Sequence, residues 1–513
     1  MERAGRTQSS ARRRRSEATG AIPQLPWRQL RNPYAPTEPL SGDQIAAIHN
    51  ASLRVLEEIG VNVLLPEARE IYRQAGADLD PNSTRVRFDR GLIESSVAKA
   101  PPRFTLHARN PARNLIFGEN YANFATVAGA PNVSDLDGGR HSGTLADMGN
   151  FIRLAHSLNI IHLIACYPVE PIDIEPNLRH LKATQLVAAL TDKAFSGYAL
   201  GRRRILDVIE MARIVRGIPD GQLDREPSLY TVVNSNSPLQ LDQPMLWGII
   251  EMACRNQVVV LTPFTLAGAM APITLAGALA QQNAEALAGI ALAQIVRPGA
   301  PVIYGGFTSN VDMRSGAPAF GTPEAAKAAQ IGGQLARRYR LPYRSSNVNA
   351  ANAPDVQAAY ESQMSIWGAL TGHCNLLVHA AGWLEGGLCA SFEKFIIDAE
   401  MLQMMQAYFE PLVVDDATLG LAAMREVGPG GHFFGAQHTL ERYETAFYAP
   451  LLSDWRSFQA WSTDGSIDTT RRANRIYRKL LQDYQPPPLD PAVAEELDAF
   501  VRRRTEEGGA PMD

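Results

Sequence analysis

Several segments of this chain place aromatic rings where a cationic ligand could be held. Tyr167, Phe264, Phe307 and Trp383 each follow a β-prone run of the sequence. A quaternary ammonium has no N–H group to donate, so ring faces and nearby anions are the attractive forces open to it, each worth roughly 0.5–2 kcal/mol. The rings therefore predict a site for a methylated cation, with capping of the core as their alternative role.

Polar residues in the same segments offer charge balance and hydrogen bonds. Glu170, Asp312 and Glu385 are candidates to balance the charge of the cation, and Arg314 or His379 could hold a substrate carboxylate. None of them forms a recognisable acid–base couple, so no catalytic residue is assigned. The amides that could position the substrate are Asn234, Asn236 and Asn347.

Metal and nucleophile chemistry find little support in the sequence. The four cysteines are scattered and form no CxxC pair, which is typical of reduced thiols in a cytoplasmic protein. His432 and His438 have a spacing compatible with a metal, but their Gly-rich surroundings favour a structural role. We predict no metal site, and the absence of a GxSxG stretch leaves a hydrolase unsupported.

A repeating pattern of strands and helices would bring these residues together. The β-prone runs lie at 123–128, 160–165, 194–199, 229–233, 258–262, 301–305, 342–348 and 375–380. The helical segments lie at 145–158, 177–190, 203–216, 243–255, 275–296, 322–339, 355–371 and 392–409. Eight strands alternating with eight helices predict an α/β fold with a closed (β/α)8 barrel, whose strand-to-helix loops share one mouth. A doubly wound open sheet is the alternative.

The remaining chain divides into three further parts. Residues 1–40 are rich in Arg, Ser and Pro and are expected to form a disordered basic leader. Residues 41–121 read as an α+β N-terminal layer, packed on a barrel that spans 122–410. Residues 411–513 are expected to form a helical C-terminal extension that covers one end of the barrel.

Composition limits the classes of partner. The chain has 513 residues, of which 45% are apolar and 20% charged, with a formal net charge of -4. This balance argues against a general nucleic-acid surface, and no apolar run is long enough to cross a bilayer. A cytoplasmic homo-oligomer is the expected form for a protein of this size.

Three motifs resemble the trimethylamine methyltransferase family. They are DMRSGAPAFGTPE (312–324), APDVQAAYE (353–361) and GPGGHFFGAQHT (428–439), the last followed by Tyr443, Pro450 and Asp454. The resemblance implies a (β/α)8 barrel that transfers a methyl group from an amine to the cobalt of a separate small corrinoid protein. The corrinoid cofactor then belongs to that partner, and this chain itself binds no cofactor tightly.

One departure from the family bears on the substrate. The trimethylamine enzymes carry pyrrolysine in the barrel, and this sequence has no such residue. Members without it resemble demethylases of quaternary amines such as glycine betaine. Loss of a methyl group from a quaternary ammonium releases a neutral tertiary amine and needs no proton, which fits the missing acid–base couple.

Two other functions stay open on the sequence alone. One is a barrel lyase or isomerase that uses a carboxylate base at the same mouth and needs no corrinoid. The other is a non-catalytic protein that binds methylated amines, because a barrel fold by itself does not define an activity.

Overall fold

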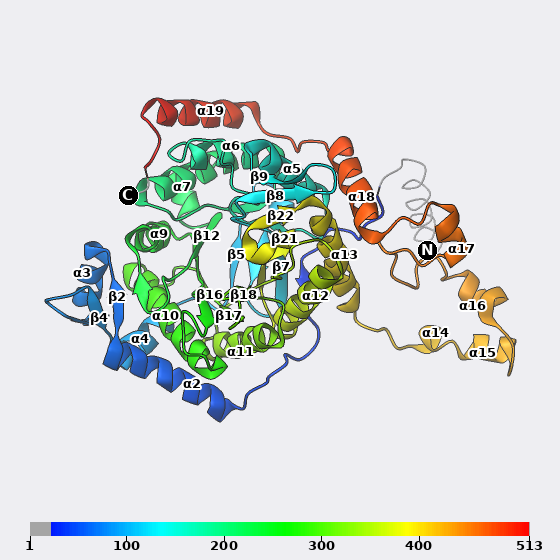
Figure 1. The fold of residues 1–513 in the computed structure, drawn as a ribbon, viewed down its shortest axis with the longest axis horizontal. Coiled ribbons are helices and arrows are strands. Elements are labelled where there is room, and N and C mark those ends of the chain that lie inside the picture. Colours follow the sequence, from blue (N-terminus) through cyan, green and yellow to red (C-terminus); the bar gives the residue numbers. More distant parts are fainter. Residues whose placement is uncertain (1–21, 512–513) are drawn as a thin grey trace.

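A closed barrel of eight parallel strands lies at the centre of the computed structural model, which describes residues 22–511 (Figure 1). The order is β7-β10-β11-β12-β14-β16-β19-β20, and pairing of β20 with β7 closes it. The strands are β7 (Tyr121–Thr126), β10 (Leu163–Ile164), β11 (Ala194–Ser196), β12 (Leu229–Val233), β14 (Val258–Leu261), β16 (Val302–Gly305), β19 (Tyr343–Ser346) and β20 (Leu376–Ala381). Each strand overlaps a predicted run, with β7 starting two residues earlier and β20 ending one residue later than predicted, so the barrel is confirmed.

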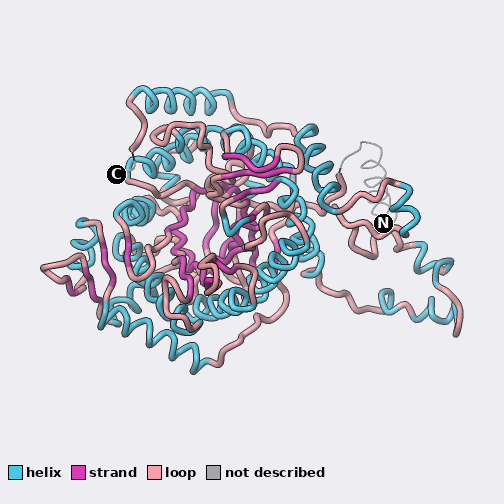
Figure 2. The backbone as a smooth tube through the Cα atoms, viewed as in Figure 1, coloured by secondary structure: helices cyan, strands magenta, loops and turns pink. Residues whose placement is uncertain are grey.

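Eight helices surround the strands (Figure 2). They are α5 (Leu145–Ser157), α6 (Arg179–Leu190), α7 (Arg202–Arg216), α9 (Gln243–Cys254), α10 (Leu275–Val296), α11 (Pro323–Tyr339), α12 (Val356–Thr371) and α13 (Phe392–Tyr408). Local chemistry sets several of their starts. The Thr322 side chain accepts a hydrogen bond from the Ala325 N–H and Pro323 opens α11, while Asp355 caps α12 in the same way.

The N-terminal layer covers one side and the bottom of the barrel. Its elements are α2 (Gly42–Arg54), η1 (Val55–Ile59), β2 (Val61–Val63), α3 (Pro66–Gln74), β3 (Asp78–Leu79), β4 (Arg85–Arg87), α4 (Arg90–Val97), β5 (Phe104–Leu106), η2 (Pro111–Arg113) and β6 (Leu115–Phe117). Helices α2 and α4 pack on α10. Strands β5 and β6 form a hairpin, and its residues Leu106 and Phe117 share one core with Leu163 and Leu376 inside the barrel. The hairpin therefore closes the end of the barrel opposite the mouth.

Residues 22–40 differ from the predicted disordered leader, whose residues 1–21 lie outside the described part. Strand β1 (Leu30–Arg31) pairs antiparallel with Tyr121 and Ala122 of β7. The Asn32 side-chain amide donates to the Leu370 carbonyl at 2.9 Å. The start of β7 extends beyond its pairing with β10, so its backbone is free to bind a further strand.

Short strands build the rim of the mouth. One small sheet contains β15 (Phe264–Ala267), β17 (Phe307–Val311) and β18 (Pro318–Ala319). A second contains β8 (Asn132–Asp135), β9 (Gly139–Ser142), β21 (Trp383–Leu384) and β22 (Cys389–Ser391), with η3 (Glu385–Gly387) between the last two. Short α8 (Asp220–Leu223) and β13 (Gln240–Leu241) complete the barrel region. Within residues 22–511 no helix combines the length and the apolar character needed to cross a membrane.

The C-terminal part lies beside the barrel rather than over one end, contrary to the prediction. It contains α14 (Asp416–Leu419), α15 (Leu421–Val427), η4 (Phe433–Gly435), α16 (Gln437–Leu440), α17 (Phe458–Thr463), α18 (Thr469–Asp483) and α19 (Pro491–Glu506). Helix α18 packs on α13 and α5, and α19 packs on α6 and α7. The Arg504 Nε–Asp207 Oδ1 pair at 2.7 Å ties α19 to α7.

Candidate functional site

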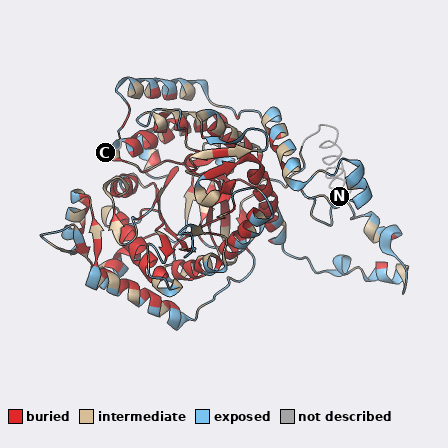
Figure 3. Cartoon of the chain, viewed as in Figure 1, coloured by how far each residue is buried: buried red, intermediate tan, exposed pale blue. Residues whose placement is uncertain are grey.

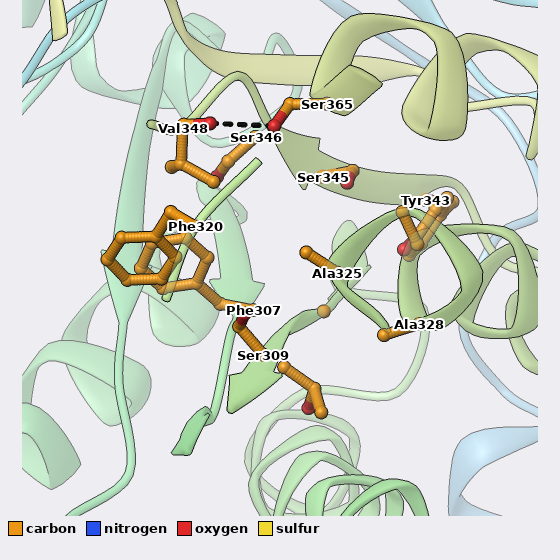
Figure 4. Close-up of a pocket in the computed structure, with 13 residues that line it drawn as sticks. Phe307, Ser309, Phe320, Ala325, Ala328, Tyr343, Ser345, Ser346, Val348 and Ser365 are labelled. Atoms are coloured by element: carbon orange, nitrogen blue, oxygen red, sulfur yellow. Dashed lines mark hydrogen bonds between the residues drawn. The ribbon is translucent and has the colours of Figure 1, made fainter. Parts of the chain in front are cut away.

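An aromatic cluster lies at the carboxyl ends of neighbouring barrel strands. The rings of Phe264 and Phe307, which open the paired strands β15 and β17, have centroids 4.9 Å apart. Phe320 stacks on Phe307 at 5.6 Å, and the two rings lie together in Figure 4. Trp383 meets Phe307 edge-on at 6.3 Å and lies 4.1 Å from the His379 ring. The structure therefore joins four predicted residues with Phe320.

A buried guanidinium adjoins this cluster. Arg344 on β19 is only 2% exposed, and its Cζ atom lies 5.2 Å from the Phe307 ring centroid. Its Nη1 donates a long 3.4 Å bond to the Gly306 carbonyl, while Nε has no partner. The ionisable groups that act on it are Cys374, Tyr343 and Tyr230, none of them a carboxylate. Burial lowers the pKa of Arg344 to about 10, so the side chain still carries its charge at neutral pH.

His379 on β20 is the second polar group beside the rings. It adopts a positive φ of 57° and is buried. Burial, with the nearby charge of Arg344, lowers the pKa of His379 well below its usual value, so the imidazole is neutral. Its Nδ1 has no hydrogen-bond partner. A neutral imidazole beside an unpaired guanidinium is arranged to receive an anion, not to supply a proton.

Further buried polar atoms near the carboxyl ends of the strands lack partners. Asn347 donates from Nδ2 to the Ala380 carbonyl at 2.9 Å, while its Oδ1 is unpartnered. Buried polar groups normally find a partner, so a group of orphans marks a place where a ligand or water completes the bonding. Other unpartnered oxygens on these strands and the segments that follow them are those of Thr262, Thr265, Asn310, Tyr343, Ser346 and Asn349.

The backbone beside Trp383 is held by a buried ion pair. Asp398 Oδ2 accepts from the Gly382 N–H at 2.8 Å, and its other oxygen pairs with Lys394. Lys394 also donates to Ser362 Oγ at 2.7 Å. Gly382 has a φ of 98°, and a Cβ there would lie 3.0 Å from the Phe395 ring. The pair therefore fixes the turn that leads from β20 into Trp383.

Tyr167 and Glu170 form a separate group after β10. The Tyr167 and Tyr198 rings meet edge-on at 4.6 Å. Tyr198 donates to Glu170, whose carboxylate lies 3.5 Å from Arg179 Nη1. Burial is the main cause that raises the pKa of Glu170. This group offers rings and an anion, but none of its ring contacts reaches the Phe307 cluster.

The other predicted residues lie in exposed or locally bonded positions. Asp312 accepts from the Ser315 hydroxyl at 2.6 Å within its own turn, and Arg314 is exposed. Glu385 pairs with Arg140 Nε at 3.0 Å. Asn236 bonds Asp242 at 3.1 Å and, like Asn234, is exposed. None of these five predicted residues has a hydrogen bond or ion pair to the aromatic cluster. They are Asn234, Asn236, Asp312, Arg314 and Glu385.

Sequence reasoning missed Arg344 and Phe320. Arg344 lies inside the predicted run 342–348, where alternation places every second side chain inside a barrel. A lone arginine in such a strand is the signal that could have identified it. Phe320 directly follows the short strand β18, which the sequence did not predict, and it lies far from the predicted run 301–305.

Two other features near the site have limited chemical scope. Behind Phe307, a cavity of about 20 Å³ lined by Ser345, Ser365, Tyr343 and Ala325 has room for one water molecule (Figure 4). Among residues 22–511, no three His, Cys, Asp or Glu side chains gather as a metal would need. The rings, Arg344 and His379 are therefore the candidates for contact with a substrate.

Comparison with known proteins adds independent findings. The profile described as Trimethylamine methyltransferase (MTTB) matches residues 3–509. Glycine betaine methyltransferase of Desulfitobacterium hafniense (strain Y51) is 38% identical over 471 residues, 92% of this chain and 98% of that protein. Trimethylamine methyltransferase MttB of Desulfitobacterium hafniense (strain DSM 10664 / DCB-2) is 29% identical over 472 residues, 91% of this chain and 94% of that protein.

A solved structure shares the fold. The crystal structure of the Methanosarcina barkeri monomethylamine methyltransferase MtmB superposes with a TM-score of 0.51 at 12% identity. The match covers 88% of this chain and 89% of that one. At this identity the likeness supports the architecture of the barrel and nothing finer.

Proposed function

This chain belongs to the trimethylamine methyltransferase family, and from that premise we propose that it demethylates a zwitterionic quaternary amine of the glycine betaine type. The methyl group passes to the cobalt of a separate corrinoid protein. The observation that carries the substrate class is the buried, unpaired Arg344 beside a cluster of aromatic rings.

Arg344 is the proposed carboxylate anchor. A buried charge without a counter-ion is costly, and a bound carboxylate removes that cost through charge-assisted bonds. The Arg344 Nε is free, and the neutral His379 can place an N–H toward the same anion. Arg314, the arginine expected from the sequence, is exposed on its loop and offers no such enclosure.

The rings are the proposed seat of the trimethylammonium group. Phe264, Phe307, Phe320 and Trp383 lie within 4.9–6.4 Å of one another, centroid to centroid, along the chain of contacts. Their faces attract a cation that cannot donate a hydrogen bond. Glycine betaine carries its cation and its carboxylate one carbon apart, which suits a site where rings and guanidinium adjoin.

The chain's own part in the reaction is binding and alignment. The corrinoid, when its carrier protein docks, supplies a nucleophilic cobalt that takes the methyl group. The residues of the mouth fit the amine: rings enclose its methyl groups, and Arg344 fixes its carboxylate. The tertiary amine leaves neutral, so no side chain must donate a proton, and the depressed pKa of His379 agrees with that.

A turnover assay tests the function. The purified protein is offered free cob(I)alamin and a panel of amines: glycine betaine, other carboxylated quaternary amines, choline and trimethylamine. We expect methylcobalamin to form with glycine betaine or a close carboxylated analogue, together with the corresponding tertiary amine. Turnover of trimethylamine but of no carboxylated amine would refute the substrate class. Conversion of a panel member without cobalamin would support the lyase alternative instead.

A further inference from the structure

The apolar stripe of α12 lies on the outside of the barrel. Val356, Tyr360, Met364 and Trp367 follow one another at helical spacing and are 79%, 60%, 41% and 41% exposed. The face turned to the barrel buries Ile366 and Leu370 together with small residues such as Ala358, Ser365 and Ala369. A helix of a soluble domain normally turns its large apolar side chains inward, and α12 carries a second apolar stripe on the opposite, exposed face. A contiguous exposed apolar stripe of this kind indicates a surface that another protein covers.

The stripe continues onto neighbouring segments. Trp367 lies 5.5 Å from the Tyr408 ring of α13, and Tyr408 lies 5.1 Å from Tyr34. Tyr408 and Tyr34 are 48% and 46% exposed, and Met404 is 49% exposed. We call this surface the α12–α13 patch. It comprises Tyr34, Val356, Tyr360, Met364, Trp367, Met404 and Tyr408.

A second apolar surface is carried by residues 411–450, which we call the arm. The arm leaves the barrel at the end of α13 and projects from the molecule (Figure 1). It returns at Leu451 and Leu452, whose N–H groups bond Glu400 Oε2 of α13 at 2.7 and 3.0 Å. The exposed apolar side chains of the arm are those of Leu412, Val413, Val414, Leu419, Leu421, Met424, Phe433, Phe434, Leu440, Tyr443 and Phe447.

The arm has no core of its own. Only Ala423 and Ala436 are buried among residues 411–450, and the arm is almost uniformly exposed in Figure 3. Its turns are closed by internal bonds, such as His438 Nε2 to the Ala417 carbonyl at 3.1 Å and the cap of Asp415 on the Thr418 N–H. Phe434 and Phe447 remain 85% and 84% exposed. Ordering 40 residues costs conformational entropy, and two buried alanines do not offset that cost. Burial of the arm's apolar side chains against a partner surface would offset it.

We propose that the arm of one copy lies on the α12–α13 patch of a second copy, and that the second arm does the same in return. Both surfaces belong to every chain, and the patch includes Met404 and Tyr408 close to the end of α13, where the arm departs, so one two-fold axis can satisfy both at once. Each aromatic ring contributes roughly 150–250 Å² when buried. Phe433, Phe434, Tyr443 and Phe447 are 46–85% exposed. Used twice, and counted with the patch surface that they cover, these rings bring the interface to the order of the roughly 1,200–2,000 Å² of a stable dimer.

The oligomeric state of the full chain tests this dimer by sedimentation velocity. The arm variant is Phe434→Ser/Phe447→Ser, and the patch variant is Tyr360→Ser/Trp367→Ser. All four residues are exposed, so the fold should persist, which thermal melts verify. The control is Ile59→Ser, which removes a 49% exposed side chain from the N-terminal layer. We expect a dimer for the wild type and the control, and a dimer dissociation constant raised at least 100-fold in both variants.

A crosslink tests which surfaces meet. In a Cys254→Ser background, which removes the exposed native thiol, one protein carries Phe434→Cys and a differently tagged protein carries Trp367→Cys. We expect a disulfide between the two tagged chains after mixing, and none when Ile59→Cys replaces Trp367→Cys. A monomeric wild type, or a dimer that neither variant weakens, would overturn the proposal. So would an arm variant that remains dimeric but no longer captures a corrinoid protein, because the arm would then be the docking surface for that partner.

Discussion

Arg344 concentrates the chemistry of the site in one residue. It keeps a positive charge in a place where burial already lowers its pKa to about 10, and no carboxylate of the described chain balances that charge. A buried charge without a counter-ion costs free energy, and a bound anion would remove that cost. The ligand that binds Arg344 therefore decides the chemistry of the site.

Removal of this charge gives the first prediction. Arg344→Met should weaken glycine betaine binding by about 1.5–3 kcal/mol, roughly 10- to 150-fold, because the carboxylate loses charge-assisted bonds. Binding of choline, which has no carboxylate, should stay unchanged. Isothermal titration calorimetry measures both, with Arg85→Met, a change of an exposed arginine on strand β4, as the control. Equal losses for the two ligands would show that Arg344 shapes the site without holding an anion.

Trp383 gives the second prediction at this scale. Trp383→Ala should cost about 0.5–2 kcal/mol in binding of glycine betaine and of choline alike, because both carry the trimethylammonium group. Trp455→Ala, which removes a 71% exposed indole of the C-terminal part, is the matched control. Unchanged affinity in Trp383→Ala would exclude this ring from the cation site.

The residues that sequence reasoning found and missed follow one physical distinction. Phe264, Phe307 and Trp383 directly follow strands, and a residue in that position of a barrel must reach the mouth. Arg344 lies within a strand, where its inward direction depends on register that the sequence does not define. Asp312 and Glu385 lie in the predicted loops, but their carboxylates already bind other side chains. Asp312 accepts from the Ser315 hydroxyl, and Glu385 pairs with Arg140.

At the scale of elements, the buried Lys394–Asp398 pair of α13 supports the turn between β20 and β21. The pair does not line the site itself. Asp398 accepts a hydrogen bond from the N–H of Gly382, the residue directly before Trp383. Removing one partner leaves an uncompensated buried charge. The pair is therefore a positioning element for Trp383.

This pair gives the third prediction. Lys394→Met should lower the free energy of unfolding by about 3–5 kcal/mol, because Asp398 then remains buried without its cation. The double variant Lys394→Met/Asp398→Leu should recover part of that loss. Urea unfolding measures all three proteins. A single variant as stable as the wild type, or a double variant less stable by the sum of two single losses, would contradict a coupled pair.

Helix α12 shows the limit of pattern reasoning for an element. The helix predicted over 355–371 forms as α12, and Val356, Tyr360, Met364 and Trp367 lie along one side of it. The pattern cannot tell whether that side meets the barrel or a partner, because Ile366 and Leu370 give the helix a second apolar side, which is the one buried. The regular alternation of eight strands and helices, in contrast, leaves a closed barrel as its favoured arrangement, and that is what forms.

For the whole molecule, buried neutral histidines predict how stability depends on pH. Burial lowers the pKa of His162 to about 3 and is also the main cause that lowers the pKa of His156 to about 4. Burial likewise lowers the pKa of His379 well below its usual value. An unfolded chain protonates histidine near pH 6.5, so below that pH the unfolded state binds more protons. Stability is thus fully present above about pH 7 and falls as the pH drops.

The fourth prediction follows from that sign. Between pH 6.5 and 5, each such histidine should reduce the free energy of unfolding by up to about 1.4 kcal/mol per pH unit. Urea unfolding at several pH values measures the slope. His162→Asn should show a shallower slope than the wild type, because one buried neutral base is gone. Identical slopes in the two proteins would show that His162 does not contribute in this way.

The central proposal is that the mouth of the barrel holds a cation among its aromatic rings and a carboxylate on Arg344. The most direct test is calorimetric binding of glycine betaine beside two analogues of similar shape: choline, which keeps the cation, and 3,3-dimethylbutanoate, which keeps the carboxylate and replaces nitrogen by carbon. We predict that glycine betaine binds at least about tenfold more tightly than either analogue, a difference of about 1.4 kcal/mol or more. Equal binding of glycine betaine and choline would contradict the role of Arg344, and equal binding of glycine betaine and 3,3-dimethylbutanoate would contradict the role of the rings.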